Sequence, residues 1–231
     1  TGAEFRSSKE DRRRSVLTPD RPIMLRKLVH WLIGVVITIA APSVVRSDQP
    51  DVPTAASLGQ RLFFDTRLSR PAGQGCVSCH QPAKAFADPR PVSPGAVAGR
   101  TGKRNSPSLM YAALIPGFVY EDFQNQDGQE VFAFEGGLFL DGRAKDLFDQ
   151  VRQPFFDPNE MNLPDESALA SRIRGSPYAD EFHTWVGDLI WEDDVQLTYN
   201  AYRALVEFLK QPFFRPFDAR IDDYLAGKEA S

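Results

Sequence analysis

The chain has 231 residues, of which 42% are hydrophobic and 25% are charged, and its formal net charge is −4. This length and apolar content suffice for one sizeable core or two small ones. The mild negative charge gives no support to nucleic-acid binding, which depends on a basic surface, so no nucleic-acid partner is expected.

The beginning of the chain has the pattern of a leader for export. Residues 1–23 are polar and basic, and we interpret them as an upstream segment, native or non-native, outside the mature protein. From Met24, charged residues precede an almost continuously apolar run over 28–41, and small residues follow up to Ser47. This order predicts a secretory signal peptide over 24–47 and export to the periplasm. An uncleaved membrane anchor is the alternative, although the run is short for a span of about 20 residues.

A helix is predicted directly after a Pro-rich linker over 48–53. Thr54 has the side chain of a helix N-cap, and its hydroxyl can accept a hydrogen bond from the first turn. Leu58, Leu62 and Phe63 then recur at the spacing of one helix face.

Five residues in the next stretch carry chemistry: Cys76-Val77-Ser78-Cys79-His80. Cys-x-x-Cys-His is the attachment sequence of a c-type haem, in which the thiols bond to the vinyl groups of the porphyrin and the histidine binds the iron. A redox dithiol needs no histidine, and a structural zinc site needs more ligands than the 2 Cys and 3 His of the whole chain can supply. The sequence therefore predicts one covalently bound haem on Cys76 and Cys79, with His80 as the ligand of its iron.

The stretch after this motif is expected to be largely irregular, because five prolines fall within 82–107. A helical pattern resumes over 105–114. Residues 117–137 form an aromatic-rich insertion with a turn at 125–128. No alternation of period two predicts a strand anywhere in the chain.

Helical patterns dominate the last third. One short helix is predicted to open at Asp165-Glu166 and close at Gly175, and a second to start with Ser176-Pro177 as N-cap and first residue. The clearest amphipathic helix spans 194–210, with one stripe formed by Val195, Tyr199, Tyr202, Val206 and Leu209. The predicted fold class is therefore mainly α, a cytochrome c-like haem domain with long irregular loops.

Several short motifs recur in a fixed order around the haem motif. They are Leu58-Gly59-Gln60-Arg61-Leu62-Phe63-Phe64-Asp65, Arg67-Leu68-Ser69, Arg104-Asn105-Ser106-Pro107-Ser108, Asp141-Gly142-Arg143-Ala144 and Glu160-Met161. Together they resemble the N-terminal half of the bacterial dihaem cytochrome c peroxidases and their MauG-like relatives. The resemblance implies a peroxidase domain over 48–226 and a second haem domain, of which 227–231 would be the truncated start. The chain is then either a fragment or a natural single-haem protein.

The resemblance also assigns roles to three residues outside the haem motif. Glu160 matches the distal glutamate that shuttles protons during O–O bond cleavage, and Gln150 matches the distal glutamine. Asn105 matches an asparagine that helps to bind calcium between the two haem domains. One carboxyl can act as both base and acid in such a cleavage, which fits Glu160. Without the resemblance, Glu160 would be an ordinary surface carboxylate, Gln150 a solvated helix residue and Asn105 a helix N-cap.

Two positions depart from the family pattern. Many relatives have a histidine that ligates the resting iron at a position near Val97, but the loop over 93–99 contains none. A tryptophan often precedes Asp-Gly-Arg, where this chain has Leu140. Met110 and Met161 are the remaining candidates for a sixth iron ligand, and the helical spacing of Met110 favours a place in the core.

The leading hypothesis is an enzyme that reduces hydrogen peroxide with electrons from a small cytochrome c or cupredoxin. A MauG-like enzyme, which uses peroxide to oxidise residues of a partner protein, is a close alternative. A monohaem electron carrier is the alternative from another class, and it would need a strong sixth ligand on the iron. Dimers are common in the family, so a homodimer is one expected assembly.

Overall fold

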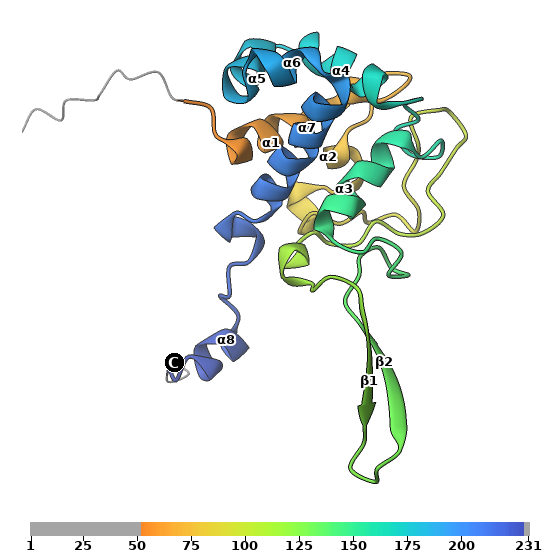
Figure 1. The fold of residues 1–231 in the computed structure, drawn as a ribbon, viewed down its shortest axis with the longest axis vertical. Coiled ribbons are helices and arrows are strands. Elements are labelled where there is room, and N and C mark those ends of the chain that lie inside the picture. The colour runs from red at the N-terminus through yellow and green to blue at the C-terminus, as the bar shows by residue number, and fades with distance from the viewer. Residues whose placement is uncertain (1–51, 229–231) are drawn as a thin grey trace, which may run out of the picture. The chain divides into compact units, whose positions relative to one another are not determined.

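The computed structural model describes residues 52–228, except for the side chain of Phe123, so the predicted signal peptide lies outside the described residues. Helices and long connections make up most of this part of the chain (Figure 1). The helices are α1 (Ala55–Phe64), α2 (Cys76–Cys79), α3 (Leu147–Phe156), α4 (Glu166–Arg174), α5 (Ala179–Val186), α6 (Asp188–Glu192), α7 (Asp194–Leu209) and α8 (Arg220–Leu225). The helix-rich character of the predicted fold class is confirmed. Within residues 52–228, no helix has both the length and the apolar character needed to cross a membrane.

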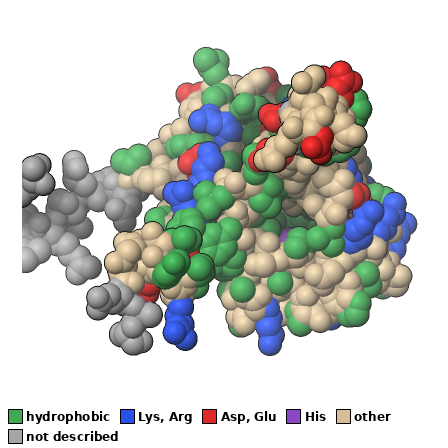
Figure 2. Space-filling view, turned by 90° about the horizontal axis from the view of Figure 1, so that it is seen from below, with side chains coloured by type: hydrophobic (Ala, Val, Ile, Leu, Met, Phe, Trp, Pro, Cys, Tyr) green, Lys and Arg blue, Asp and Glu red, His purple; other side chains and the backbone are tan. Residues whose placement is uncertain are grey.

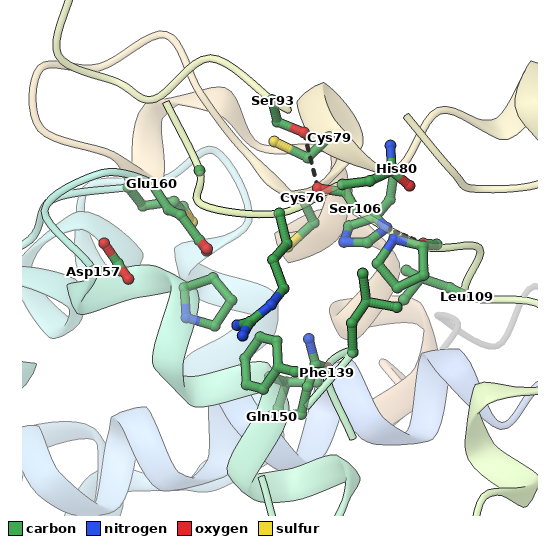
Figure 3. A pocket seen from close by; sticks show the side chains of 18 of the residues that line it. Cys76, Cys79, His80, Ser93, Ser106, Leu109, Phe139, Gln150, Asp157 and Glu160 are labelled. Carbon is green, nitrogen blue, oxygen red and sulfur yellow. Dashed lines mark hydrogen bonds between the residues drawn. The ribbon is translucent and has the colours of Figure 1, made fainter. Parts of the chain in front are cut away.

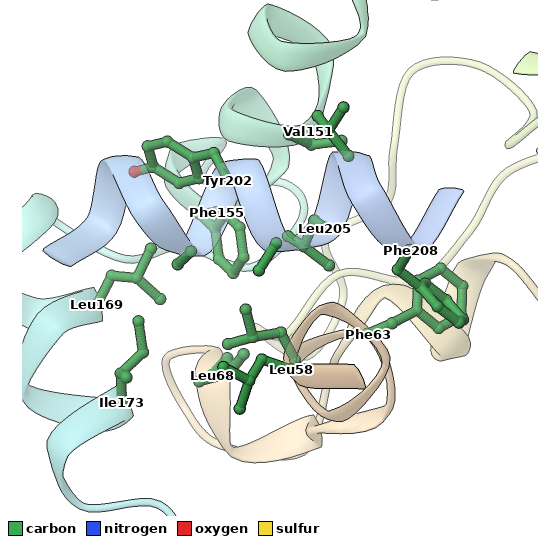
Figure 4. Packing of buried hydrophobic residues seen from close by; sticks show 14 of the residues in the cluster. Leu58, Phe63, Leu68, Val151, Phe155, Leu169, Ile173, Tyr202, Leu205 and Phe208 are labelled. Carbon is green, nitrogen blue, oxygen red and sulfur yellow. The ribbon is translucent and has the colours of Figure 1, made fainter. Parts of the chain in front are cut away.

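The core forms where α1 crosses α7, with α3 and α4 packed on other sides of α7 (Figure 4). The predicted face of α1 is confirmed, because Leu58, Leu62 and Phe63 are all buried. The ring of Phe63 lies 5.4 Å from that of Phe208 on α7, measured between centroids. Full burial of one such side chain stabilises the fold by roughly 1.5–3 kcal/mol, so this crossing fixes the frame on which the rest is built.

Gly59 allows the close approach of α1 to α7, because a Cβ atom at this position would overlap the carbonyl oxygen of Ala204. Gly59→Ala is therefore expected to lower the free energy of unfolding by about 1–3 kcal/mol through overpacking. Alanine's better helix propensity, worth about 1 kcal/mol, offsets only part of this cost. Urea unfolding measures the difference, and Gly102→Ala, whose Cβ would make ordinary contacts, is the control. An unchanged stability of Gly59→Ala would contradict the close crossing.

Two predicted helix starts are confirmed by their caps. The Thr54 hydroxyl accepts a hydrogen bond from the N–H of Ser57 at 3.1 Å, and the Ser57 hydroxyl accepts one from the N–H of Thr54 at 3.0 Å. Asp165 caps α4 in the same way, accepting the N–H of Ala168 at 2.8 Å. The clearest predicted helix, 194–210, is confirmed as α7.

The predicted start of the next helix is wrong, and the predicted stripe of α7 is confirmed only in part, because Tyr202, Val206 and Leu209 are buried. Ser176 and Pro177 lie in a turn, and α5 begins at Ala179. Val195 and Tyr199 of the stripe are exposed. Because α1, α3 and α4 contact α7 from different directions, its buried surface is wider than one stripe and uses small residues where helices approach. The buried set includes Leu197, Ala201, Ala204, Leu205 and Phe208.

The expectation of no strand is also wrong. Strands β1 (Val119–Gln124) and β2 (Glu130–Glu135) pair antiparallel within the aromatic-rich insertion, and in Figure 1 this hairpin extends away from the helices. The predicted turn is confirmed: the Asn125 side chain accepts the N–H groups of Asp127 and Gln129. The strands are largely exposed, so no buried face imposes an alternation that the sequence could reveal.

The helix expected over 105–114 is wrong except for a 3₁₀ turn at Ala112–Leu114. Tyr111 has φ of 63°, a left-handed conformation that a right-handed helix cannot contain. Its N–H donates to the carbonyl oxygen of Phe214 at 2.7 Å instead of to the preceding turn. A tertiary contact therefore overrides the local helical pattern here.

Candidate haem-binding site

A cavity of about 310 Å³ is walled by α2, α3, the end of α7 and the loop that follows the haem motif. Figure 2 shows a hollow in the surface, with hydrophobic side chains around it and a histidine inside it. All the residues predicted to act at the site line this cavity: Cys76, Cys79, His80, Asn105, Gln150 and Glu160. Folding thus brings together groups that lie up to 84 positions apart in the chain.

Helix α2 presents both thiols of the haem motif to the cavity (Figure 3). Its first turn is closed by Ser78, whose hydroxyl accepts the N–H of Gly75 at 3.1 Å. Neither cysteine is in a disulfide. Burial, with a smaller contribution from Cys79, raises the pKa of the Cys76 thiol to about 12. Both sulfurs are therefore free and close to one cavity wall, as the attachment of a vinyl-bearing porphyrin requires.

The orientation of His80 leaves one ring nitrogen free for a metal. Its Nδ1 lies 3.0 Å from the carbonyl oxygen of Phe86 and 3.1 Å from that of Pro107. A carbonyl only accepts, so Nδ1 carries the proton and Nε2 keeps its lone pair. Burial lowers the pKa of His80, which keeps the ring neutral and able to ligate. The Arg-Asn-Ser-Pro motif thus supports the predicted iron ligand through the backbone of Pro107.

Asn105 fastens this motif to the loop after His80. Its side-chain nitrogen donates to the carbonyl oxygens of Asp88 at 3.0 Å and Arg90 at 2.6 Å. Among residues 52–228, no group of three or more His, Cys, Asp or Glu side chains is placed to hold a metal ion. Calcium typically takes 6–8 oxygen ligands, so Asn105 would supply only a small part of such a site. We therefore expect calcium to bind only weakly to this chain, and tight stoichiometric binding in a calorimetric titration would contradict this.

The wall opposite His80 comes from α3 and the turn after it. In Figure 3, Glu160 and Asp157 lie on one side of the cavity, and His80 and Leu109 on the other. Gln150, Pro154 and Asp157 follow one another at i, i+4 and i+7, so they share one face of the helical segment. Pro154 has no N–H, and the carbonyl of Gln150 therefore lacks its usual partner within the helix.

The Glu160 carboxyl has the electrostatic environment of a proton-transfer group. Burial raises its pKa above the usual range, and the negative charge of Asp157 raises it further, while Arg143 acts in the opposite direction. The backbone holds it firmly, because its N–H donates to the Asp157 carbonyl at 3.0 Å and its own carbonyl accepts the N–H of Ala96 at 2.7 Å. A carboxyl with a raised pKa is protonated more easily than a solvated one, so it can serve both as acid and as base.

The loop over 93–99, in which relatives often have a histidine, is fastened to the turn that carries Glu160. Besides the bond from Ala96, a Cβ on Gly95 would overlap the carbonyl oxygen of Asn159, so only glycine fits there. Ser93 and Pro94 contribute this loop's part of the cavity lining. The loop therefore supports the cavity wall that lies opposite His80.

The two methionines and the substituted tryptophan position have different places. Met161 is 3% exposed and lines the cavity, whereas Met110 packs partly buried against the core. Leu140 lines the cavity but is 59% exposed, so it lies at the edge of the cavity.

Sequence reasoning gave no role at the site to many side chains of the cavity wall, among them Phe139, Arg143, Pro154 and Asp157. Asp157 and Pro154 could have been found from their helical spacing to Gln150. Arg143 was recognised only as part of a motif, and nothing in the sequence indicates that it faces the same space as Glu160.

The two free thiols and the free Nε2 of His80 belong to residues that line one cavity, and they fit a c-type haem. The fold and the site therefore define the class of protein: a helical c-type haem domain with a carboxyl across the cavity from the histidine. The chain belongs to the di-haem cytochrome c peroxidase family, because the model of that family matches residues 53–230. The resemblance inferred from the motifs is confirmed.

Individual relatives agree with this assignment. Methylamine utilization protein MauG of Paracoccus denitrificans is 38% identical over 205 residues, which cover 86% of this chain and 51% of that protein. Cytochrome c551 peroxidase of Pseudomonas aeruginosa is 31% identical over 170 residues, covering 71% of this chain and 42% of that protein. The crystal structure of the diheme peroxidase BthA from Burkholderia thailandensis has a TM-score of 0.66 and 34% identity, over 79% of this chain and 44% of that one. The chain thus spans about half the length of the curated relatives it matches.

Proposed function

We propose that residues 48–226 form a c-type haem domain that reduces hydrogen peroxide with electrons from a small cytochrome c or cupredoxin. The observation that carries this proposal is the position of Glu160. A carboxyl with a raised pKa lies across the cavity from the histidine that would ligate the iron. Family membership supports the proposal, since the relatives include a cytochrome c551 peroxidase and a diheme peroxidase.

Each residue of the site has a definite part in this chemistry. Cys76 and Cys79 would hold the haem through thioether bonds, and Nε2 of His80 would bind its iron. When bound, the haem would supply the iron through which two electrons from the donor protein reach the peroxide. Glu160 accepts a proton from one peroxide oxygen and returns it to the other, so that water rather than hydroxide departs. The Gln150 amide, on the same side of the cavity, can orient the peroxide by hydrogen bonding.

A MauG-like activity, the peroxide-dependent oxidation of a partner protein, is the second candidate. The identity of 38% to the Paracoccus MauG protein and the loop over 93–99 without histidine favour it. Leu140 in place of the usual tryptophan weakens it, because electrons taken from the partner would have to reach the haem by another route. A monohaem electron carrier would instead need a strong sixth ligand, for which Met161 is the buried candidate at the cavity.

The ferric spectrum of the holo-protein tests the enzyme against the carrier. With His80 as the only protein ligand of the iron, we expect a high-spin resting spectrum, rapid cyanide binding and peroxide consumption without reductive activation. A low-spin spectrum with no peroxide reaction would instead support the carrier. Oxidation of a reduced small cytochrome during peroxide consumption supports the peroxidase. Consumption that such a donor does not accelerate supports the MauG-like reaction.

Export to the periplasm is part of the proposal, because cysteines are joined to c-type haem outside the bacterial inner membrane. It rests on the charged residues, short apolar run and small residues of the leader over 24–47. We expect the mature protein to begin near Asp48, which N-terminal sequencing of the periplasmic fraction checks. Retention of residues 28–41 would indicate a membrane anchor instead. The second haem and the homodimer stay predictions from the family resemblance.

A further inference from the structure

The cavity wall carries a group of cations that the proposed peroxide chemistry does not use. Lys103, Arg104 and Arg143 all line the cavity, and Asp141 is the carboxylate between the two arginines. One Asp141 oxygen accepts a hydrogen bond from Arg104 Nη1 and the other accepts one from Arg143 Nη1, each at 2.8 Å. Three cations and one carboxylate leave two positive charges uncompensated within this group.

The position of Arg143 is fixed from a second direction. Its guanidinium carbon lies 3.5 Å from the ring centroid of Phe139, so the planar group stacks on the aromatic face. One of its nitrogens is bonded to Asp141, and an arginine has five N–H donors in total. The group is therefore held in place and keeps donors for a further partner.

This group lies away from the attachment cysteines. In Figure 3, Phe139 and Gln150 lie at one end of the view, and Cys76 and Cys79 at the other. Arg143 lies at the Phe139 end, because its guanidinium stacks on that ring. The cavity thus has thiols at one end and cations at the other.

The substituents of a haem are arranged in a matching way, with different groups at opposite edges of the porphyrin. Two of its edges carry the vinyl groups to which cysteines bond, and the opposite edge carries two propionate carboxylates. Partly buried carboxylates need cationic or hydrogen-bonding partners, and arginine binds them through two parallel N–H groups. The two uncompensated positive charges would balance the two negative charges of the ionised propionates.

We propose that Arg104 and Arg143, held in place by Asp141 and Phe139, bind the propionate carboxylates of the haem. Lys103 adds a third positive charge, from an ammonium group that lacks the bidentate geometry of a guanidinium. This assignment rests on the proposed covalent haem and gives a role to the Asp-Gly-Arg motif. Asp141 accepts a hydrogen bond from each arginine, and stacking on Phe139 fixes the plane of the Arg143 guanidinium. The haem is then fixed at both ends, by thioethers at one and by ion pairs at the other.

The test uses the holo-protein with Arg104→Gln and Arg143→Gln. The matched control is Arg152→Gln, an exposed arginine on α3 that is not among the residues lining this cavity. Resonance Raman spectroscopy reads the propionate bending band directly. We expect this band to shift in Arg104→Gln and Arg143→Gln because a hydrogen bond is lost, and to stay unchanged in Arg152→Gln.

Redox titration gives an independent readout. Removing either cation leaves a propionate charge uncompensated, which stabilises ferric iron, so the reduction potential should fall. The propionate pKa should rise, and the pH range in which the potential varies should move upward with it. Arg143→Lys keeps the positive charge but not the bidentate geometry of the guanidinium. Compared with Arg143→Gln, its reduction potential should therefore return closer to the wild-type value than its propionate Raman band does.

The outcomes separate this assignment from the proposed function. If wild-type protein carries no covalent haem, the proposed function fails. If haem is covalent but the band and potential of both arginine variants match those of Arg152→Gln, the propionate assignment alone is overturned. If neither variant yields holo-protein, acid titration of the wild-type Raman band decides. Propionate protonation at a lower pH than that of a solvated propionate supports the assignment, and protonation in the pH range of a solvated propionate overturns it.

Discussion

Glu160→Gln is expected to slow the reaction of the holo-protein with peroxide by about 10²–10⁴-fold, the usual contribution of a positioned acid or base. Glutamine keeps the size of the side chain and removes its ability to transfer a proton. The resting ferric spectrum should change little, because Glu160 lies across the cavity from His80. Stopped-flow mixing with peroxide measures the rate.

The pH dependence of this rate gives a sharper test. The carboxylate form is the base that starts the reaction, so the rate should rise as pH rises through the raised pKa of Glu160. The Gln variant should lack this rise. In Asp157→Asn the rise should move to lower pH, because the neighbouring negative charge that helps to raise the pKa has been removed.

The controls separate chemistry from folding. Glu192→Gln changes an exposed carboxyl at the end of α6 and should leave the rate unchanged. A raised pKa means that the protonated carboxyl is favoured in the folded state, so its stabilising contribution is lost as pH rises through that pKa. Glu160→Gln should therefore be at least as stable as wild type at neutral pH. Equal peroxide rates in Glu160→Gln and wild type would remove Glu160 from the mechanism.

The replacement of Cys76 and Cys79 together by alanine is expected to abolish covalent haem attachment. Each single variant should keep at most one thioether bond and give a lower yield of holo-protein. The reason is geometric, since α2 brings both sulfurs to the same cavity wall. Mass spectrometry of the denatured protein measures the mass of attached haem.

Val77→Ala is the matched control, because it changes α2 and leaves the Cys-x-x-Cys-His motif intact. We expect it to retain the full haem mass. The c-type assignment would be wrong if acidified organic solvent extracted the haem from wild-type protein, since thioether bonds survive that treatment.

The predicted chemistry of the site came from the sequence alone. Cys76, Cys79 and His80 are contiguous, and the spacing of a covalent haem motif depends on one helical turn and on nothing distant. The same holds for the caps at Thr54 and Asp165, because capping is a contact within three residues. Local chemistry is therefore what the sequence could predict.

The assembly of the site was decided by tertiary structure. Gln150 and Glu160 could be connected to the haem motif only through a family resemblance, since their side chains meet it across a cavity. Asn105 supports the loop after His80 through two backbone carbonyls, which no sequence pattern could indicate. The same is true of Arg143, whose partners Phe139 and Asp141 define its orientation.

The wrong predictions have the same physical origin. The helix expected near Tyr111 is replaced because its N–H bonds to Phe214, about 100 positions later. The stripe chosen for α7 is right only in part, because the helices α1, α3, α4 and α6 together determine which of its faces are buried. The strands of the hairpin have no buried face, so burial left no alternation to read. Sequence alone determined short-range bonds and the covalent haem motif, whereas burial and long-range contacts, which depend on the whole packed chain, were decided only in the folded structure.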